Sequence, residues 1–233
     1  MTISNKLHLA GETYLVCLES RIAGDGFCDE ACYKFYLLRL FNCLNLFQVK
    51  LHAYLLLPRE VSLLVTPGSP FCLRNLMRTI NRSYSEYFNT RFGRAVKVWS
   101  DTPRSSLVQE ATLALQCQKY IERRPLAESE LGHPGIYRWS SYCTNAFGGG
   151  FHYLKPLAAY KAFIIETTNP YKAYREYIAT PFKQEFLLYL QRRIESGAPI
   201  TKTGRRSRRK TNEYRRDARL VQFSSTTPLH GQG

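Results

Sequence analysis

Acidic residues are scarce in this sequence, paired cysteines are missing, and no long apolar run is present. The 233 residues include 18 Asp and Glu against 33 Lys and Arg, so the formal net charge is +15. No stretch of about 18 consecutive apolar residues occurs, so we expect no membrane-spanning helix. Residues 1–10 lack the apolar core of a signal peptide, which favours a cytoplasmic protein.

The seven cysteines are odd in number, and none of them forms a CxxC pair. Cys28 and Cys32 are four residues apart, but no second pair completes a zinc site. Reduced thiols in a cytosolic protein are the simplest interpretation. The glycine run at 148–150 is not followed by Gly-Lys-Ser or Gly-Lys-Thr, so no phosphate-binding P-loop is predicted.

The excess of basic charge points to a polyanionic partner, nucleic acid first and an anionic membrane second. Residues 202–219 contain nine Lys and Arg against two Asp and Glu. Residues 201–233 have few apolar residues, so we predict a disordered basic tail there. Its candidate phosphate contacts are Arg205, Arg206, Arg208, Arg209 and Lys210.

A second basic feature lies in the segment 71–89, where Arg74, Arg78 and Arg82 recur at every fourth residue. A helix places such residues in one row on its surface. A row of arginines is ordinarily a solvated face of a helix. In a chain this basic, contact with nucleic-acid phosphates is the alternative, and both interpretations stay open.

Hydrophobic periodicity predicts an α+β domain built on an antiparallel sheet. Strands are expected at residues 12–20, 47–57, 60–66, 96–99 and 105–108, and helices at 30–46, 71–89 and 110–123. The order β-α-β-β-α-β is the split βαβ, ferredoxin-like plan, with helices on one face of the sheet and the other face open for a ligand. The apolar stripe of the first helix is Ala31, Phe35, Leu38, Phe41 and Leu44.

Three parts are predicted along the chain: a domain at 1–146, a helical extension at 147–200 and the basic tail at 201–233. Helices of the extension are expected at 157–167, 170–179 and 181–196. The extension is rich in tyrosine, with Tyr160, Tyr171, Tyr174, Tyr177 and Tyr189. Aromatic residues at helical spacing favour a packed core, and stacking on nucleic-acid bases is the alternative.

The stretch 54–65, Tyr-Leu-Leu-Leu-Pro-Arg-Glu-Val-Ser-Leu-Leu-Val, carries two polar residues on an otherwise apolar strand. Period-two alternation puts Glu60 and Ser62 on one face of this strand, with Val61 and Leu63 on the other. A buried sheet accepts polar side chains at a cost in free energy, so two of them on one face indicate a site.

This stretch and several others resemble motifs of one family, in the same order along the chain. Leu-Pro-Arg-Glu-Val-Ser-Leu-Leu at 57–64 is similar to Met-Pro-Asn-His-hydrophobic-His-Leu-Leu of the HUH tyrosine transposases, in particular the REP-associated tyrosine transposases. Tyr-Ile-Glu-Arg-Arg-Pro at 120–125 and Tyr-Arg-Trp-Ser-Ser-Tyr at 137–142 resemble the family's Tyr-Ile-Glu-Leu-Asn-Pro and Tyr-Pro-Trp-Ser-Ser-Tyr. Segments 73–89 and 98–108 also resemble the family, which implies an HUH endonuclease-like fold over roughly residues 10–200.

The resemblance also implies roles for single residues. In the family, the Tyr of Tyr-Ile-Glu attacks a DNA phosphodiester, and a divalent metal held by two His and one Asn activates that phosphate. Tyr120 keeps the nucleophile position, whereas the three ligand positions are Glu60, Ser62 and Arg124. Ser is a poor ligand and Arg has no lone pair to give, so we predict a site without metal and an inactive Tyr120. We predict that Glu60 and Arg124 pair directly.

We therefore predict a DNA-binding protein derived from a tyrosine transposase, without cofactor, that binds hairpin or single-stranded DNA, with a regulatory role open. Arg104 and Arg123 are further candidate phosphate contacts. The expected location is cytoplasmic and nucleoid-associated, no membrane is a partner, and the oligomeric state is open.

Two alternatives remain. The first is an active transposase that uses Mg²⁺ or Mn²⁺ and cleaves and rejoins single-stranded DNA through a 5′-phosphotyrosine on Tyr120. The second is an RNA-binding protein or protein-interaction scaffold. It is less favoured because the strand at 60–66 lacks the Phe and Tyr series of RNA-binding sheets.

Overall fold

The computed structural model describes residues 8–128, 132–149, 152–165 and 167–202. Contacts gather the chain up to Ile200 into one compact unit, and the fold below is that of this unit. Nearly all of the predicted tail lies outside the described residues, so its disorder and its five candidate phosphate contacts stay predictions. The boundary between residues 146 and 147 also stays a prediction.

An antiparallel sheet of four strands is the centre of the described part of the chain. The strands β1 (Thr13–Glu19), β2 (Val49–Leu57), β3 (Glu60–Pro67) and β4 (Arg104–Val108) stand in the order β2-β3-β1-β4. Helix α1 (Glu30–Leu46) joins β1 to β2, and α2 (Cys72–Phe92) joins β3 to β4. Each crossover skips one strand, which is the split βαβ plan, so the predicted fold class is confirmed.

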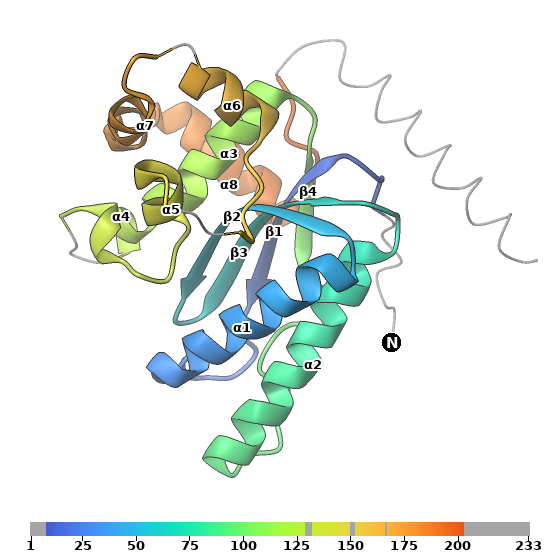
Figure 1. Ribbon diagram of the computed structural model, residues 1–233. Coiled ribbons are helices and arrows are strands. Elements are labelled where there is room, and N and C mark those ends of the chain that lie inside the picture. The colour runs from blue at the N-terminus through green and yellow to red at the C-terminus, as the bar shows by residue number, and fades with distance from the viewer. Residues whose placement is uncertain (1–7, 129–131, 150–151, 166, 203–233) are drawn as a thin grey trace, which may run out of the picture. The chain divides into compact units, whose positions relative to one another are not determined.

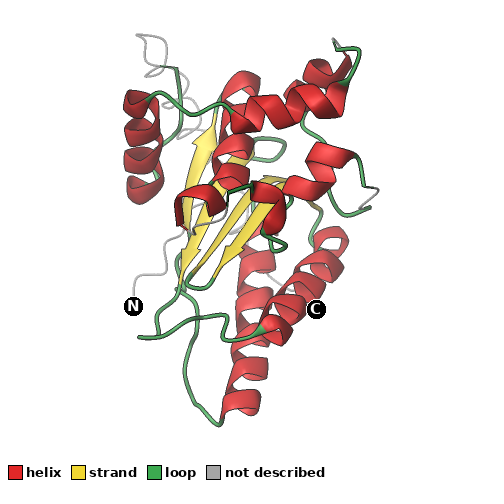
Figure 2. Ribbon diagram, turned by 90° about the vertical axis from the view of Figure 1, so that its left-hand side faces the viewer, coloured by secondary structure: helices red, strands yellow, loops and turns green. Residues whose placement is uncertain are grey.

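The crossover helices α1 and α2 pack against each other on one face of the sheet (Figures 1 and 2). The carboxylate of Asp29 accepts a hydrogen bond from the backbone N–H of Cys32 at 2.9 Å, which caps the start of α1. Gly93 ends α2 with a φ of +61°, a conformation that costs glycine nothing because it has no Cβ. Local signals in the sequence thus mark the start of α1 and the end of α2.

The opposite face of the sheet is covered as well. Helix α3 (Ala111–Arg123) contacts β2, β3 and β4, and α8 (Gln184–Ser196) contacts β1 and β4. Helices α6 (Ala158–Ile165) and α7 (Pro170–Ala179) pack on α3. The shorter elements on this side are α4 (Pro125–Glu128), the 3-10 helix η1 (Pro134–Ile136) and α5 (Tyr142–Phe147).

The prediction of an open sheet face is therefore wrong. The helices of residues 147–200 each carry an apolar side, and Ile178, Leu190 and Ile194 are buried in one cluster with Leu15 and Leu55 of the sheet. Burying these side chains removes apolar surface from water, which favours a covered face over an open one. In the same cluster, Tyr160 and Tyr174 are buried and Tyr177 and Tyr189 pack against it, so the core interpretation of these four tyrosines is confirmed. For Tyr171 it is wrong, because this residue is 39% exposed.

Residues 96–99 form no strand of the described sheet, contrary to the prediction. The segment contributes one isolated bridge, between Trp99 and Ser20. Its tryptophan turns inward, and the ring centroid of Trp99 lies 4.9 Å from that of Phe27 and 5.8 Å from that of Tyr84. Backbone hydrogen bonds from Arg21 N to the Val98 carbonyl at 2.8 Å and from Ser100 N to the Glu19 carbonyl at 3.0 Å hold the segment beside the end of β1.

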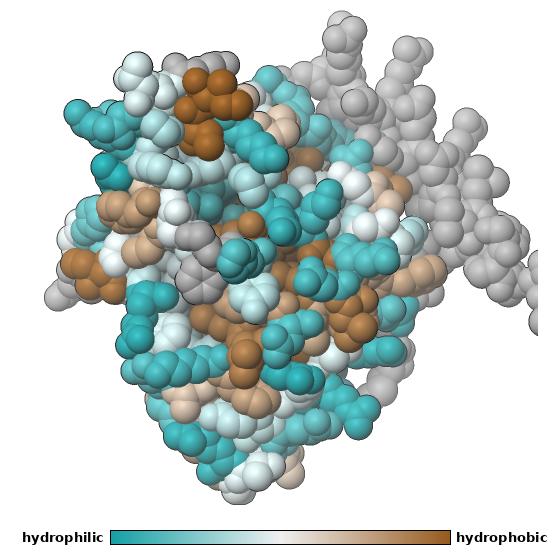
Figure 3. All heavy atoms as spheres, viewed as in Figure 1, coloured by the Kyte–Doolittle hydropathy of each residue, from teal (hydrophilic) through white to brown (hydrophobic). Residues whose placement is uncertain are grey.

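The apolar stripe of α1 matches the prediction only in part. Phe41 and Leu44 are buried as predicted, but Leu38 is 57% exposed, and Tyr33, Tyr36 and Leu40 are buried in addition. Because α1 is apolar on more than one side, spacing alone could not choose the face that meets α2 and the sheet. Hydrophobic side chains consequently gather on the surface over α1, where Leu38 and Leu46 are exposed (Figure 3). None of the described helices is long and apolar enough to cross a membrane.

Candidate functional site

The predicted site residues Glu60, Ser62 and Arg124 meet at one end of β3. Glu60 begins this strand, Ser62 follows on the same face, and Arg124 comes directly after α3. The Arg124 guanidinium donates from Nη2 to Glu60 Oε2 at 3.0 Å, and from Nη1 to Glu60 Oε1 and to Ser62 Oγ, the last at 3.3 Å. Ser62 Oγ donates to Glu60 Oε1 at 2.5 Å. The pairing of Glu60 with Arg124 that the sequence predicts is present.

This ion pair is largely withdrawn from water, with 16% of the Arg124 side chain and 20% of the Glu60 side chain exposed. Burial raises the pKa of the Glu60 carboxyl, but the hydrogen bonds and charge of Arg124 outweigh it and, with Ser62, hold the pKa below its ordinary value. Glu60 is therefore an anion matched to a cation. Cys17 Sγ lies 3.5 Å from Ser62 Oγ, and burial, followed by the Glu60 charge, raises the pKa of this thiol to about 12.

The donor set at this position does not fit a divalent metal. Both oxygens of Glu60 already accept hydrogen bonds from Arg124, and Ser62 uses its hydroxyl proton on the same carboxylate. A guanidinium offers no lone pair and carries the same sign of charge as the metal. In the described part of the chain, no group of three or more His, Cys, Asp and Glu could hold a metal ion.

Tyr120 borders this ion pair. It lies one helical turn before Arg124, whose backbone N–H donates to the Tyr120 carbonyl at 3.2 Å. The Arg124 Cζ is 5.8 Å from the centroid of the Tyr120 ring, and the Tyr120 residue is 8% exposed. The four residues predicted for one site are thus close together, and their chemical roles stay predictions.

Glu122 forms a second polar cluster, which sequence reasoning missed. Its Oε1 accepts hydrogen bonds from Ser141 Oγ and Asn145 Nδ2, both at 2.6 Å, and its Oε2 accepts one from Tyr174 OH at 2.7 Å. Burial raises the pKa of Glu122 to about 7, against the effect of these three hydrogen bonds. The cluster ties α3 to α5 and α7. Glu122 belongs to the motif Tyr-Ile-Glu and Ser141 to the motif Trp-Ser-Ser-Tyr, so these two motifs could have indicated the cluster from the sequence.

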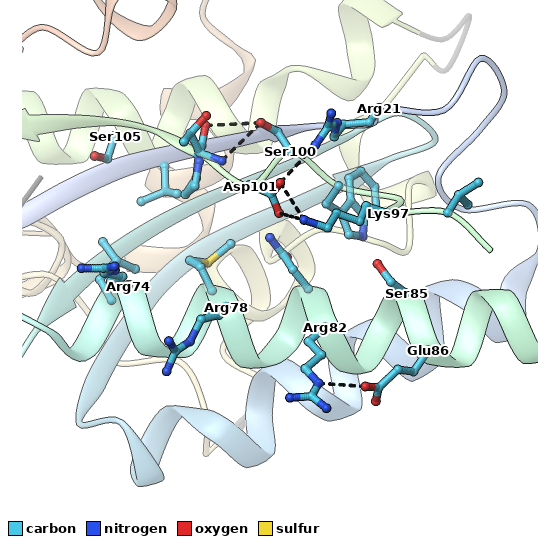
Figure 4. A pocket seen from close by; sticks show the side chains of 18 of the residues that line it. Arg21, Arg74, Arg78, Arg82, Ser85, Glu86, Lys97, Ser100, Asp101 and Ser105 are labelled. Carbon is cyan, nitrogen blue, oxygen red and sulfur yellow. Dashed lines mark hydrogen bonds and ion pairs between the residues drawn. The ribbon is translucent and has the colours of Figure 1, made fainter. Parts of the chain in front are cut away.

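A groove of about 1070 Å³ runs between α2 and residues 96–105. Arg74, Arg78 and Arg82 line it from α2, as Figure 4 shows. Arg21 and Lys97 line it too, and each contacts Asp101 at 3.1 Å. Sequence spacing predicted the arginine row, but the groove and its facing wall follow only from the packing of distant segments.

Among the predicted phosphate contacts in the groove, Arg82 forms an exposed ion pair with Glu86 of α2 at 2.8 Å. Two further predicted phosphate contacts lie outside the groove and also have protein partners. Arg104 forms an ion pair with Glu19 on the neighbouring strand. Arg123 Nη1 donates to the carbonyls of Ile178 and Ala179, at 2.8 and 2.5 Å, at the end of α7. Since the last carbonyls of a helix lack partners within the helix, Arg123 stabilises that end.

Comparison with known proteins bears on the fold. No protein-family model matches the chain, and no curated protein matches it in sequence. Among solved structures, it is similar to a REP-associated tyrosine transposase bound to a REP hairpin, with a TM-score of 0.54 and 12% sequence identity. The likeness covers 67% of this chain and 99% of that chain. The chain therefore has a fold similar to that of a REP-associated tyrosine transposase.

Proposed function

We propose that this protein binds DNA, as a hairpin or a single strand, and does not cleave it by a metal-dependent route. The observation that carries the proposal is the ion pair of Glu60 and Arg124, on a fold similar to that of a transposase bound to a DNA hairpin. The fold supports the class of ligand, and the ion pair supports the loss of cleavage. Such a protein would act at the nucleoid.

Charge supports the DNA-binding half of the proposal. The net charge of +15 attracts a polyanion, and part of that charge is organised along the groove by Arg74, Arg78 and Arg82. Successive arginines four residues apart on a helix are separated by about 6 Å along its axis, so several phosphates of one strand can be contacted at once. Each such contact releases counterions and strengthens binding at low salt.

The ion pair supports the second half. A phenol such as Tyr120 is a weak nucleophile, because its ordinary pKa is near 10. Attack on a phosphodiester needs an electrophile that stabilises charge on the phosphate oxygens. Arg124 is the cation next to Tyr120, but Glu60 neutralises it through two hydrogen bonds. A DNA phosphate would have to displace this carboxylate.

A second candidate function, an active transposase, is favoured by one observation. Tyr120 and Arg124 are neighbours, and an arginine can stabilise a phosphoryl transition state if the carboxylate moves away. Mg²⁺ or Mn²⁺ would then bind only after Arg124 had left Glu60. The two candidates differ in whether a covalent bond between Tyr120 and DNA forms.

The test uses the full chain with hairpin and single-stranded DNA, with and without Mg²⁺ or Mn²⁺. We expect retarded DNA on a native gel and neither cut DNA nor a covalent protein–DNA band on a denaturing gel. Tyr120→Phe should bind DNA as the wild type does. A covalent band that Tyr120→Phe abolishes would establish the active transposase instead. DNA that is never retarded, at any salt concentration, would remove the DNA-binding proposal.

A matched set of variants tests the metal. The resemblance gives His, His and Asn as the ligands, so Glu60→His, Ser62→His and Arg124→Asn together restore a complete set. We expect Mn²⁺ to raise the melting temperature of the triple variant and to leave that of the wild type unchanged. If Mn²⁺ raised the melting temperature of the wild type and Glu60→Gln abolished this effect, the wild-type site would bind metal and the proposal would be contradicted.

A further inference from the structure

The groove between α2 and residues 96–105 has polar atoms at its lining that no protein group satisfies. We infer that this groove holds one unpaired nucleobase, and that Asn81 and Trp99 recognise its edge. The inference rests on the proposed DNA binding and adds the place where a base is held and the residues that recognise it.

Asn81 comes from α2 and Trp99 from the facing segment, and both line the groove. Asn81 Oδ1 and Trp99 Nε1 are buried and have no hydrogen-bond partner among the described residues. Trp99 as a whole is 2% exposed. Buried polar groups in proteins are nearly always paired, because an unpaired one costs about 1–3 kcal/mol. An acceptor and a donor on facing walls therefore call for a ligand with a donor and an acceptor.

A nucleobase has this chemistry. Each base presents hydrogen-bond donors and acceptors side by side on an edge, and its faces are apolar. The rest of the groove lining suits those faces, since the partly exposed side chains of Val96 and Pro103 line it, over the buried Leu73 and Met77 of α2. Its volume of about 1070 Å³ is at the upper end for small-molecule sites, so a base fits together with its sugar.

The charges lie where the phosphates on either side of that base would be. Arg78 and Arg82 line the groove and also a second hollow beside Thr79 and Ser83, so they form the outer rim between the two. In Figure 4 their side chains project from α2 away from Lys97 and Asp101. A strand that turns one base inward would lay its backbone along this rim, as single-strand binders do with basic grooves.

The ring of Trp99 is held in place by neighbouring side chains, one of them on α2. Its ring packs against Phe27 and Tyr84, and a Cβ added at Gly26 would lie 2.6 Å from its Cη2 atom. On the far wall, Asp101 contacts both Arg21 and Lys97 and holds these cations at the mouth. Protein contacts thus hold Trp99, Arg21 and Lys97 in place before DNA binds.

The fluorescence of Trp99 can report on base binding. Trp99 and Trp139 are the two tryptophans of the chain, so replacing Trp139 leaves the emission of Trp99 alone. In a Trp139→Phe background, the emission of Trp99 is followed during titration with single-stranded DNA about 12 nucleotides long. We expect a saturable change in emission with the same midpoint as the gel shift. A strand of equal length made of abasic sites should bind at least about tenfold more weakly and leave the emission unchanged.

Asn81→Leu should weaken binding of the normal strand by about tenfold and have little effect on the abasic strand. Asn42→Leu, at an exposed position of α1, is the control for a change of the same kind outside the groove. Asn81→Ala removes the same acceptor oxygen with a smaller side chain and serves if the leucine variant does not fold. It should also weaken binding.

Three results would overturn the inference or its basis. Normal DNA that is retarded on the gel without any change in Trp99 emission would show that no base enters the groove. Equal affinity of the wild type and both Asn81 variants for the normal strand would show that Asn81 does not recognise the base. In both cases DNA binding itself would stand. A wild type that retards no DNA would remove the proposed function, and this inference with it.

Discussion

Arg124 donates hydrogen bonds to both carboxylate oxygens of Glu60, although 64 residues separate the two in sequence. The contact joins the end of α3, the helix that carries Tyr120, to the start of β3. The motif resemblance predicts that the family's metal site would lie at this position. One ion pair therefore ties α3 to the sheet, and we predict that it also keeps Arg124 from assisting Tyr120.

A double-mutant cycle should detect the coupling of Glu60 and Arg124. We expect Arg124→Leu and Glu60→Gln each to lower the free energy of unfolding, because each leaves a largely buried partner without its counterpart. The double variant should lose less than the sum, with a coupling of about 1–3 kcal/mol. Urea unfolding at pH 7 measures all four proteins. Additive losses within about 0.5 kcal/mol would mean that the pair contributes no stability of its own.

The buried carboxyl of Glu122 should make stability fall as the pH rises. Burial raises its pKa from the ordinary 4.5 to about 7, so the folded protein holds a proton that the unfolded chain releases. This contribution is fully present below pH 4.5 and is lost as the pH passes through about 7. The wild type should lose about 2–3 kcal/mol relative to Glu122→Gln between pH 5 and pH 8.

Urea unfolding at the two pH values measures this difference. A glutamine at position 122 stays neutral at both values and keeps an oxygen that can accept from Ser141 and Asn145. Glu195→Gln, at an exposed position of α8, serves as the control and should leave the dependence unchanged. Parallel curves for the wild type and Glu122→Gln would mean that Glu122 does not titrate in this range.

Arg78 should contribute to the salt dependence of DNA binding. It is exposed on α2 at the rim of the groove, where a phosphate contact would release about one counterion. Arg78→Ala should reduce the slope of log affinity against log salt by about one. Arg192→Ala, at an exposed position of α8 across the sheet, removes the same charge and should leave the slope unchanged. Equal slopes for both variants would place the DNA elsewhere.

Gly26 should not tolerate a side chain. A Cβ there would lie 2.6 Å from Cη2 of Trp99, whose ring is held by Phe27 and Tyr84 and cannot easily move. We expect Gly26→Ala to lower the free energy of unfolding by about 1–3 kcal/mol through overpacking. Gly24→Ala, in the same loop with no atom within 4 Å, should change it by less than about 0.5 kcal/mol. Two equal, small effects in urea unfolding would refute the close contact.

Much of the fold could be predicted because its signals are local. Alternation at 60–66, the cap at Asp29 and the prolines that follow helices each act over a few residues, and each marks an element that is present. The face of α1 could not be predicted, since Leu38 and Leu40 are equally apolar and only the neighbouring helix and sheet distinguish them. The strand predicted at 96–99 is reduced to one bridge with Ser20, and its own alternation could not show that the partner segment offers so few residues for pairing.

For the candidate site, the sequence determined which side chains belong together, through the residue types at positions 60, 62, 120 and 124 and the order of the resembling motifs. It also determined that Glu60 and Arg124 carry opposite charges. The tertiary structure decided the rest. It covered the sheet face that was expected to be open, buried Glu122 among Ser141, Asn145 and Tyr174, and formed a groove from α2 and residues 96–105. These features depend on contacts between segments tens of residues apart. Periodicity describes a segment's own surface, and packing decides which other surface meets it.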